Sequence, residues 1–163
     1  MKNGILDISY EEKYLKEVVN LFINTVHNIN KKDYTKEQLD AWTSKNIDLK
    51  AWKNRLKTSN TYLCMLEDEI VGFYIYEDDY IDCFYVHHEY QGLKVGRFML
   101  EQILKDADKH GIKLLRVDAS ITAKPFFEKF GFKEVKKNYV KRANQTLINY
   151  SMIKDMSNQK EKD

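Results

Sequence analysis

The chain has little of what marks a multidomain, exported or membrane protein. Pro125 is its only proline, and no internal repeat or low-complexity stretch is visible, which indicates one continuous domain. No apolar run approaches the length that spans a bilayer, and residues 1–4 lead into an expected strand without the pattern of a secretion signal. We therefore expect a cytoplasmic protein that does not act on a membrane.

Cysteine and unbalanced charge are scarce as well. Cys64 and Cys83 fall in expected strands of a chain without export signals, where free buried thiols are more common than a disulfide. His87 and His88 are adjacent but lack a third ligand, so no metal is expected. The net charge of +2 is too small to indicate nucleic acid as a partner.

What the chain does have is the composition of a globular α/β domain. Its 163 residues are 43% hydrophobic and 32% charged, enough for one domain with a sizeable core. Alternating apolar residues predict strands, of which the second to fourth form an antiparallel meander. The expected strands cover residues 4–8, 61–67, 70–77, 80–86, 113–118, 132–140 and 146–154.

Helix-capping patterns complete this outline. Ser9 with Glu12 and Thr35 with Gln38 have the spacing of capping boxes, and Asp48 is expected to cap a third helical segment. Two further helices are expected over residues 95–107 and 123–130, each followed by a glycine at the C-cap.

The segment 80–110 organises the chain. A strand is followed by a loop with Gly92 and Gly96 and then by an amphipathic helix, and the strand at 113–118 closes a β-α-β unit whose strands should be parallel. The first turn of a helix has unpaired N–H groups, and glycines let an anion approach them closely. Lys94 and Arg97 add positive charge, so the loop is a candidate phosphate site, although a tight turn without a ligand would use the same glycines.

Two blocks of residues resemble a known family. Val86 followed by Gln91–Gly96 is similar to the Gln/Arg-x-x-Gly-x-Gly/Ala pyrophosphate loop of the GNAT superfamily, the acetyl-CoA-dependent N-acetyltransferases. Residues 119–132 are similar to the helix of that family that ends in a Gly-Phe pair, here Gly131 and Phe132. The resemblance extends over residues 4–154 and is weaker outside the two blocks.

This resemblance implies a fold and a cofactor site. The fold is a single α/β (α+β) domain over residues 1–154, followed by a charged tail at 155–163. Its mixed, mostly antiparallel sheet has about seven strands, about four flanking helices and a splayed parallel strand pair at the cofactor cleft. The cofactor is acetyl-CoA (coenzyme A). Backbone groups of two strand residues, the main chain of the phosphate loop with Arg97, and one side of the cleft would hold it: Phe84, Val86; Gln91, Gly92, Leu93, Lys94, Val95, Gly96, Arg97; Ser120, Pro125, Phe126, Phe127.

Two positions depart from the family pattern. Lys94 stands where glycine is preferred, so its Cβ restricts the backbone while its ammonium can contact a phosphate. Phe127 stands where many members have a tyrosine that protonates the departing thiolate, which leaves water, Tyr85 or Tyr139 as the expected donor.

Candidates for the base and for the acceptor site follow from position. Asp82 is expected to share a strand face with Phe84 and Val86, which makes it a candidate base, although an aspartate paired for structural reasons or an ordered water remains an alternative. His27, Tyr34 and Trp42 are expected to contact the acceptor, since related folds place it there. Residues 33–42 also resemble a bacterial GNAT subgroup of unassigned acceptor.

The expected activity is acetyl transfer from acetyl-CoA to a primary amine by direct attack in a ternary complex. The alternatives are a CoA-binding module that lacks catalysis, which Lys94 and Phe127 favour, and a protein-interaction domain on the same fold. The acceptor is a small-molecule or peptide amine, with an antibiotic, a polyamine, an amino acid and a peptide N-terminus all open. The resemblance also implies a possible homodimer through the C-terminal strands.

Overall fold

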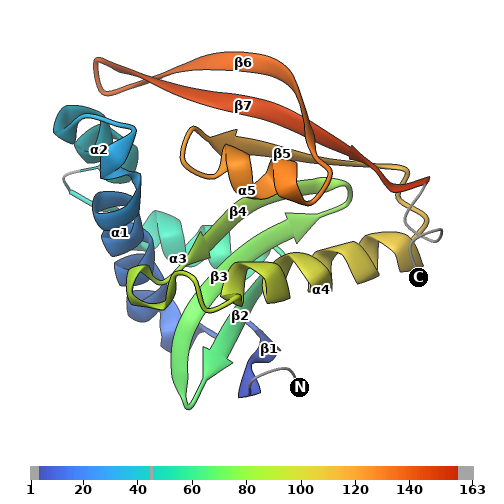
Figure 1. Cartoon of the computed structure of the whole chain (residues 1–163). Coiled ribbons are helices and arrows are strands. Elements are labelled where there is room, and N and C mark those ends of the chain that lie inside the picture. Colours follow the sequence, from blue (N-terminus) through green and yellow to red (C-terminus); the bar gives the residue numbers. More distant parts are fainter. Residues whose placement is uncertain (1–3, 45, 158–163) are drawn as a thin grey trace.

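The structure, a computed structural model, describes residues 4–44 and 46–157 and contains one mixed sheet of seven strands (Figure 1). The strand order is β1-β2-β3-β4-β5-β7-β6, in which β4 and β5 are parallel and all other neighbours are antiparallel. The strands are β1 (Leu6–Ser9), β2 (Thr61–Leu66), β3 (Glu69–Glu77), β4 (Tyr80–Val86), β5 (Leu114–Ser120), β6 (Lys133–Arg142) and β7 (Gln145–Asp155). The helices are α1 (Leu15–Ile29), α2 (Lys36–Thr43), α3 (Leu49–Thr58), α4 (Val95–Lys109) and α5 (Lys124–Lys129).

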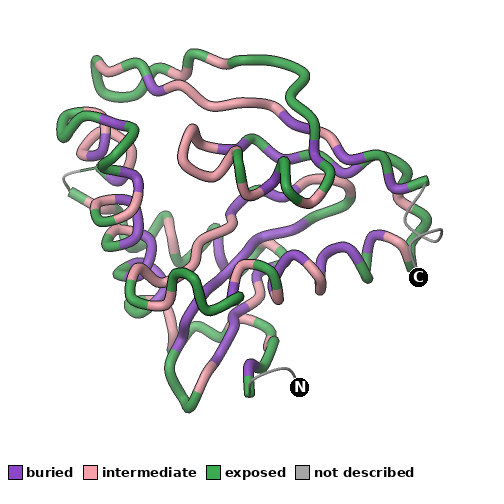
Figure 2. The backbone as a smooth tube through the Cα atoms, in the orientation of Figure 1, coloured by how far each residue is buried: buried purple, intermediate pink, exposed green. Residues whose placement is uncertain are grey.

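The helices cover both faces of the sheet and bury two apolar clusters (Figures 1 and 2). One cluster joins the apolar faces of α1, α2 and α3 to side chains of β2 and β3, among them Leu63 and Phe73. The other joins α4 and α5 to side chains of β5 and β7, among them Leu115 and Met152. Each helix shows apolar residues at helical spacing, which is why one face of it is buried and the other is exposed.

Two of the three expected helix caps are confirmed. Thr35 and Gln38 form a complete capping box at the start of α2, with hydrogen bonds of 2.8 and 3.1 Å, and Asp48 accepts the N–H of Ala51 in α3. The capping box expected at Ser9 is wrong. Ser9 pairs with β2 as the last residue of β1, so its backbone belongs to the sheet and α1 begins only at Leu15.

The end of the described chain is packed against the sheet. β7 runs to Asp155, and the side chain of Met156 is only 4% exposed while its N–H donates to the carbonyl of Lys113 (2.9 Å). Ordered packing thus continues beyond residue 154, where the tail was expected to begin. The rest of that expected tail, residues 158–163, lies outside the described residues.

The parallel pair β4–β5 separates soon after it forms. Tyr80 pairs with Arg116 and Ile81 pairs with Val117, but no pairing of the two strands follows, although β5 pairs with β7 along its whole length. The two strands therefore diverge toward their carboxyl ends. We call the gap between β4 and β5 beyond Ile81 and Val117 the fork.

The closed end of the fork is held by polar contacts between the two strands. The guanidinium of Arg116 donates two hydrogen bonds to Asp79 (3.0 and 2.9 Å), and the N–H of Arg116 donates to the Asp79 carbonyl (2.7 Å). The hydroxyl of Tyr80 donates to Asp118 (2.8 Å). Arg116 thereby holds the pKa of Asp79 below its usual value.

A β-bulge in β4 sets which side chains face the fork. Ile75 of β3 pairs with Cys83, but the next residue, Tyr76, pairs with Ile81, so Asp82 is an extra residue without a partner in β3. One inserted residue shifts the two-residue alternation by one position. Residues on either side of Asp82 therefore point to faces that the sequence alone does not reveal.

None of the helices within residues 4–44 and 46–157 has the length and apolar character needed to cross a bilayer. The same residues bring no three metal-binding side chains together, and Cys64 and Cys83 are both free and buried.

Candidate active site

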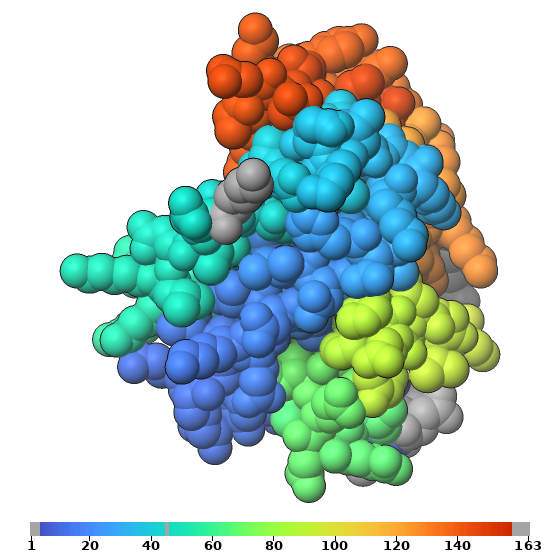
Figure 3. All heavy atoms as spheres, turned by 90° about the vertical axis from the view of Figure 1, so that its left-hand side faces the viewer, coloured from blue at the N-terminus to red at the C-terminus, as the bar shows by residue number. Residues whose placement is uncertain are grey.

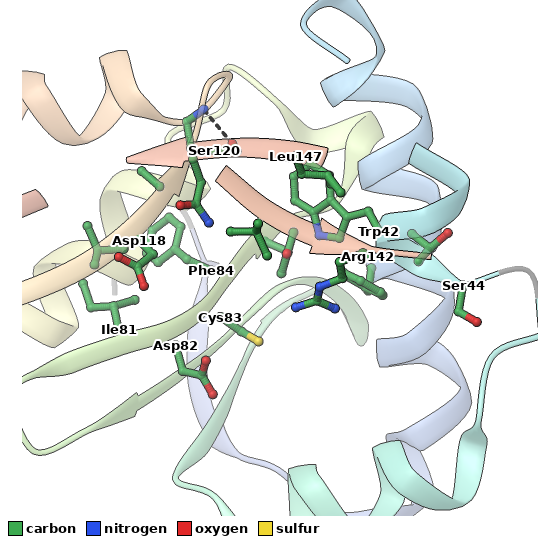
Figure 4. A pocket seen from close by; sticks show the side chains of 18 of the residues that line it. Trp42, Ser44, Ile81, Asp82, Cys83, Phe84, Asp118, Ser120, Arg142 and Leu147 are labelled. Atoms are coloured by element: carbon green, nitrogen blue, oxygen red, sulfur yellow. Dashed lines mark hydrogen bonds between the residues drawn. The ribbon is translucent and has the colours of Figure 1, made fainter. Parts of the chain in front are cut away.

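A cavity of about 620 Å³ lies at the fork, a volume typical of small-molecule sites (Figure 4). Its lining comes from α1, α2, α3, the open ends of β4 and β5, α5, and the β6–β7 hairpin. Figure 3 shows the tip of this hairpin, in orange-red, close to α2, and Gln38 ties the two together by donating to the carbonyl of Thr146 (2.8 Å). We call this space the acceptor cavity.

The main chain of β4 faces the fork at alternate residues. His87 donates its N–H to the carbonyl of Val71 in β3 (2.8 Å), so the antiparallel pattern turns the N–H and C=O groups of Phe84 and Val86 toward β5. The Val86 carbonyl is already used, because Thr25 (3.0 Å) and Gln91 (2.9 Å) both donate to it. Phe84 keeps both backbone groups on this open edge.

The segment 91–97, which we call the phosphate loop, includes the first turn of α4, and no side chain caps this helix start. Lys94 is the N-cap of α4, yet its side chain makes no capping hydrogen bond, and the first turn contains Arg97 instead of an acidic residue. Three N–H groups, those of Val95, Gly96 and Arg97, have no acceptor inside the helix. A helix start with free donors and a basic residue is suited to bind an anion.

The backbone of the phosphate loop confirms the expected constraint at Lys94. This residue adopts φ +66°, a left-handed conformation that favours glycine, the residue that the resembled pattern prefers at this position. Gly92 is also left-handed, at φ +78°. A Cβ on Gly96 would lie 3.3 Å from the ring of Phe126, so the helix start and α5 approach each other closely here.

Aromatic rings from α5 form one wall of the fork. Phe127 is 2% exposed, and its ring lies 5.3 Å from the rings of both Phe84 and Phe132. Phe126 packs on Phe84 at 5.6 Å, and Pro125 is exposed at the start of α5. Ser120 lines the cavity and accepts the N–H of Ala123 (3.0 Å). The side chain at position 127 has no hydroxyl, so Phe127 contributes only an apolar ring to this wall.

The expected orientation of Asp82 is wrong. Because of the β-bulge, Asp82 does not share a face with Phe84 and Val86, which pack against the cluster under α4. Its carboxylate instead pairs with Arg55 of α3 (3.0 Å), which also reaches the sulfur of Cys83 (3.2 Å). Asp82 still lines the acceptor cavity, but as the partner of an arginine.

The two candidate tyrosines have different surroundings. Tyr85 lines the acceptor cavity, packs against Phe22 and Phe73, and is hydrogen-bonded by Trp42. Burial raises the pKa of its hydroxyl, so it is protonated at neutral pH. Tyr139 is 65% exposed and does not line the cavity, so its expected place at the site is wrong: it lies on the outward face of the edge strand β6.

Two of the three expected acceptor contacts line the cavity. Tyr34 and Trp42 form an edge-to-face pair at 5.2 Å, and the Tyr34 hydroxyl receives the N–H of Ile121 (2.8 Å). Burial raises the pKa of Tyr34 to about 12. His27 is not part of the lining and lies behind it, 3.0 Å from the hydroxyl of the lining residue Thr43, so its contact with the acceptor stays a prediction.

Three charged residues of the cavity were not anticipated, Arg55 described above and two more. Asp118 follows the paired part of β5 and accepts hydrogen bonds from Tyr80 (2.8 Å) and Ser151 (2.7 Å). Arg142 is the last residue of β6 and points into the cavity in Figure 4. Asp118 could have been found because ligands lie beyond the carboxyl ends of parallel strands. Arg142 lies two residues after the apolar Val140, and the two-residue alternation of a strand puts both side chains on the same face of β6.

Comparisons with known proteins agree with this geometry. The model of a family described as "Acetyltransferase (GNAT) domain" matches residues 30–154. A protein of Escherichia coli K12 named "Uncharacterized N-acetyltransferase YafP" is 32% identical over 150 residues, which cover 92% of this chain and 95% of that protein.

Solved structures have the same fold. A GCN5-related N-acetyltransferase of Rhodopseudomonas palustris superposes with a TM-score of 0.88 at 30% identity, covering 92% of this chain and 94% of that chain. The PaiA N-acetyltransferase of Thermoplasma acidophilum, solved in complex with coenzyme A, gives a TM-score of 0.74 at 16% identity over 93% of this chain and 98% of that chain.

Proposed function

The chain belongs to the GNAT family of acetyltransferases, and we propose that it transfers the acetyl group of acetyl-CoA to a primary amine by direct attack in a ternary complex. The observation that carries this proposal is the open fork. A gap between two parallel strands, with a cavity on one side and an uncapped helix start nearby, suits a long thioester with phosphates at its far end.

The residues present fit acetyl-CoA as the acyl donor. The free N–H groups of Val95, Gly96 and Arg97 supply donors for the pyrophosphate, and the Lys94 ammonium adds charge. The backbone of Phe84 supplies a donor and an acceptor for the pantetheine arm, as a neighbouring strand would. The coenzyme A complex of the Thermoplasma relative supports the same use of the fold.

The proposed reaction needs a group that receives a proton from the amine. Asp118 fits because it lies at the fork, on the side of the acceptor cavity, and its carboxylate is held in place by Tyr80 and Ser151. Asp82 is less suited because Arg55 neutralises its charge. We assign Asp118 as the base, acting directly or through one water.

The departing thiolate needs a proton donor as well. Phe127 cannot supply one, whereas the Tyr85 hydroxyl carries a proton at neutral pH and lines the cavity. We assign Tyr85 this role, directly or through water. Direct transfer needs no covalent enzyme intermediate, and the order of events is attack of the amine on the thioester carbonyl, collapse, and protonation of sulfur.

A thiol-release assay with acetyl-CoA across an amine library tests the proposal. We expect CoA thiol to appear only when a suitable amine is present, with acetylated amine formed in equal amount. Tight CoA binding without any transfer would instead favour the alternative of a CoA-binding module, for which Phe127 is the structural argument. Absence of CoA binding would contradict both.

A further inference from the structure

The charged side chains of the acceptor cavity are all engaged except one. Arg55 forms an ion pair with Asp82. Asp118 accepts hydrogen bonds from two hydroxyl groups, and Asp48 caps α3. Arg142 has neither an ion pair nor a hydrogen bond within residues 4–44 and 46–157, although it lines the cavity. Among the charged residues of the described lining, Arg142 is therefore the one without an ion pair or a hydrogen bond.

The direction of Arg142 is fixed by the β6–β7 hairpin. Asn138, Val140 and Arg142 lie on one face of β6 by alternation: Asn138 bonds to side chains of β7, Val140 lines the cavity, and Arg142 comes next on the same face. The hairpin is anchored because Tyr34 donates to the carbonyl of Ile148. Figure 4 shows the guanidinium of Arg142 projecting into the cavity.

The cavity has charges of opposite sign at its two ends. Asp118 and Asp82 lie at the fork, where the amine must arrive, while Figure 4 places Arg142 away from the fork, on the side of Trp42. The positive charges of Arg55 and Arg142 both lower the pKa of the Tyr85 hydroxyl, against the larger effect of burial, so both guanidinium groups lie near this hydroxyl. A guanidinium binds a carboxylate by two parallel hydrogen bonds.

We propose that the acceptor is a small amino acid whose carboxylate binds Arg142 while its amine lies at the fork. This inference rests on the proposed acetyl transfer and adds the class of the substrate. The rings of Phe22, Trp42 and Trp52 also line the cavity, so an apolar part of the amino acid can pack between its amine and its carboxylate.

Matched pairs of acceptors test the inference. Each pair consists of an amino acid, with its amine in the α or the ω position, and the corresponding carboxamide, which keeps the shape and loses the charge. We expect the best carboxylate to exceed its carboxamide in kcat/KM by about tenfold or more, as a charge-assisted pair implies. Arg142→Gln should bring this ratio close to one.

Lys141→Gln is the matched control, since Lys141 is an exposed neighbour on the outward face of the same strand. It removes the same formal charge and should keep the ratio of the wild type. A wild-type ratio near one, or an Arg142→Gln variant that lowers both members of a pair equally, would overturn the inference while acetyl transfer stands.

Binding provides a readout that does not require turnover. Calorimetry should show the carboxylate binding more tightly than the carboxamide to CoA-saturated protein, with the difference lost in Arg142→Gln. If CoA itself does not bind, the proposed function fails, and the same titration on cofactor-free protein still decides whether Arg142 holds a carboxylate. Equal binding of both members would contradict the inference in either case.

Discussion

The two faces of the fork are built in different ways. The cofactor face consists mostly of main-chain groups from one continuous stretch, β4 and the phosphate loop, with the rings of α5 beside it. The acceptor face consists of side chains that converge from α1, α2, α3, β5 and the β6–β7 hairpin. From this difference we expect the proposed acyl donor to be recognised by backbone geometry and the acceptor to be selected by side-chain chemistry.

The largest expected effect comes from closing the cofactor face. Gly96→Trp fills the space beside Phe126, where even a Cβ would lie at 3.3 Å, and should lower CoA affinity by more than about a hundredfold. The measurement is the rise of Tm with added CoA, which saturating ligand should increase in the wild type. Gly96→Ala, which adds only the Cβ, serves as a milder variant for folding.

Binding of an amino acid to the acceptor cavity should survive in Gly96→Trp if the two faces act separately. A Gly96→Trp protein that keeps the Tm response to CoA would contradict the assignment of the phosphate loop.

The next effect concerns the base. Asp118→Asn keeps the shape and removes the proton acceptor, so we expect kcat to fall by about a hundredfold at neutral pH with CoA affinity unchanged. Asp82→Asn should cost less, because Arg55 already neutralises that carboxylate. Steady-state kinetics of the two variants make the comparison, and a larger loss in Asp82→Asn would exchange the two roles.

A smaller effect is expected for the proton donor. Tyr85→Phe removes the hydroxyl and should lower kcat by about tenfold, since water can replace it in part. Tyr139→Phe is the matched control on the outward face of β6 and should leave kcat as it is. Equal rates for the wild type and Tyr85→Phe would mean that water alone protonates the thiolate.

Much of the fold could be predicted from the sequence, because it depends on local patterns, whereas the residues of the cofactor face follow from the resemblance to a family and stay a prediction. The capping box at Thr35 and the parallel β-α-β unit follow from residues near one another in the chain, and the constraint at Lys94 follows from the family pattern that this segment resembles. The capping box expected at Ser9 failed because pairing between distant strands decides where β1 ends.

The acceptor face was harder to predict for the same reason. The orientation of Asp82 depends on a β-bulge that exists only in the pairing of β4 with β3, and no sequence period reveals it. Arg142 comes near enough to lower the pKa of Tyr85 because Gln38 of α2 holds the β6–β7 hairpin at its Thr146 carbonyl. Tyr139 and Arg142 lie on opposite faces of β6, and alternation alone does not tell which of the two faces lines the cavity.

The smallest expected effect separates backbone strain from charge at Lys94. Lys94→Gly relieves the left-handed conformation and should raise the free energy of unfolding by about 0.5–1 kcal/mol. The same change removes an ammonium and should weaken CoA binding by about two- to fivefold. Denaturant unfolding and CoA titration measure the two effects, and unchanged stability would mean that the loop tolerates a side chain there without strain.

The claim on which the account depends is that the fork receives the pantetheine arm. Calorimetric titration of cofactor-free protein with acetyl-CoA, and with the nucleotide half of coenzyme A that lacks this arm, tests it directly. We predict one site for each ligand and an affinity for acetyl-CoA at least about tenfold higher, since only acetyl-CoA can use the free backbone groups of Phe84. Equal affinities, or no heat from acetyl-CoA, would contradict the account.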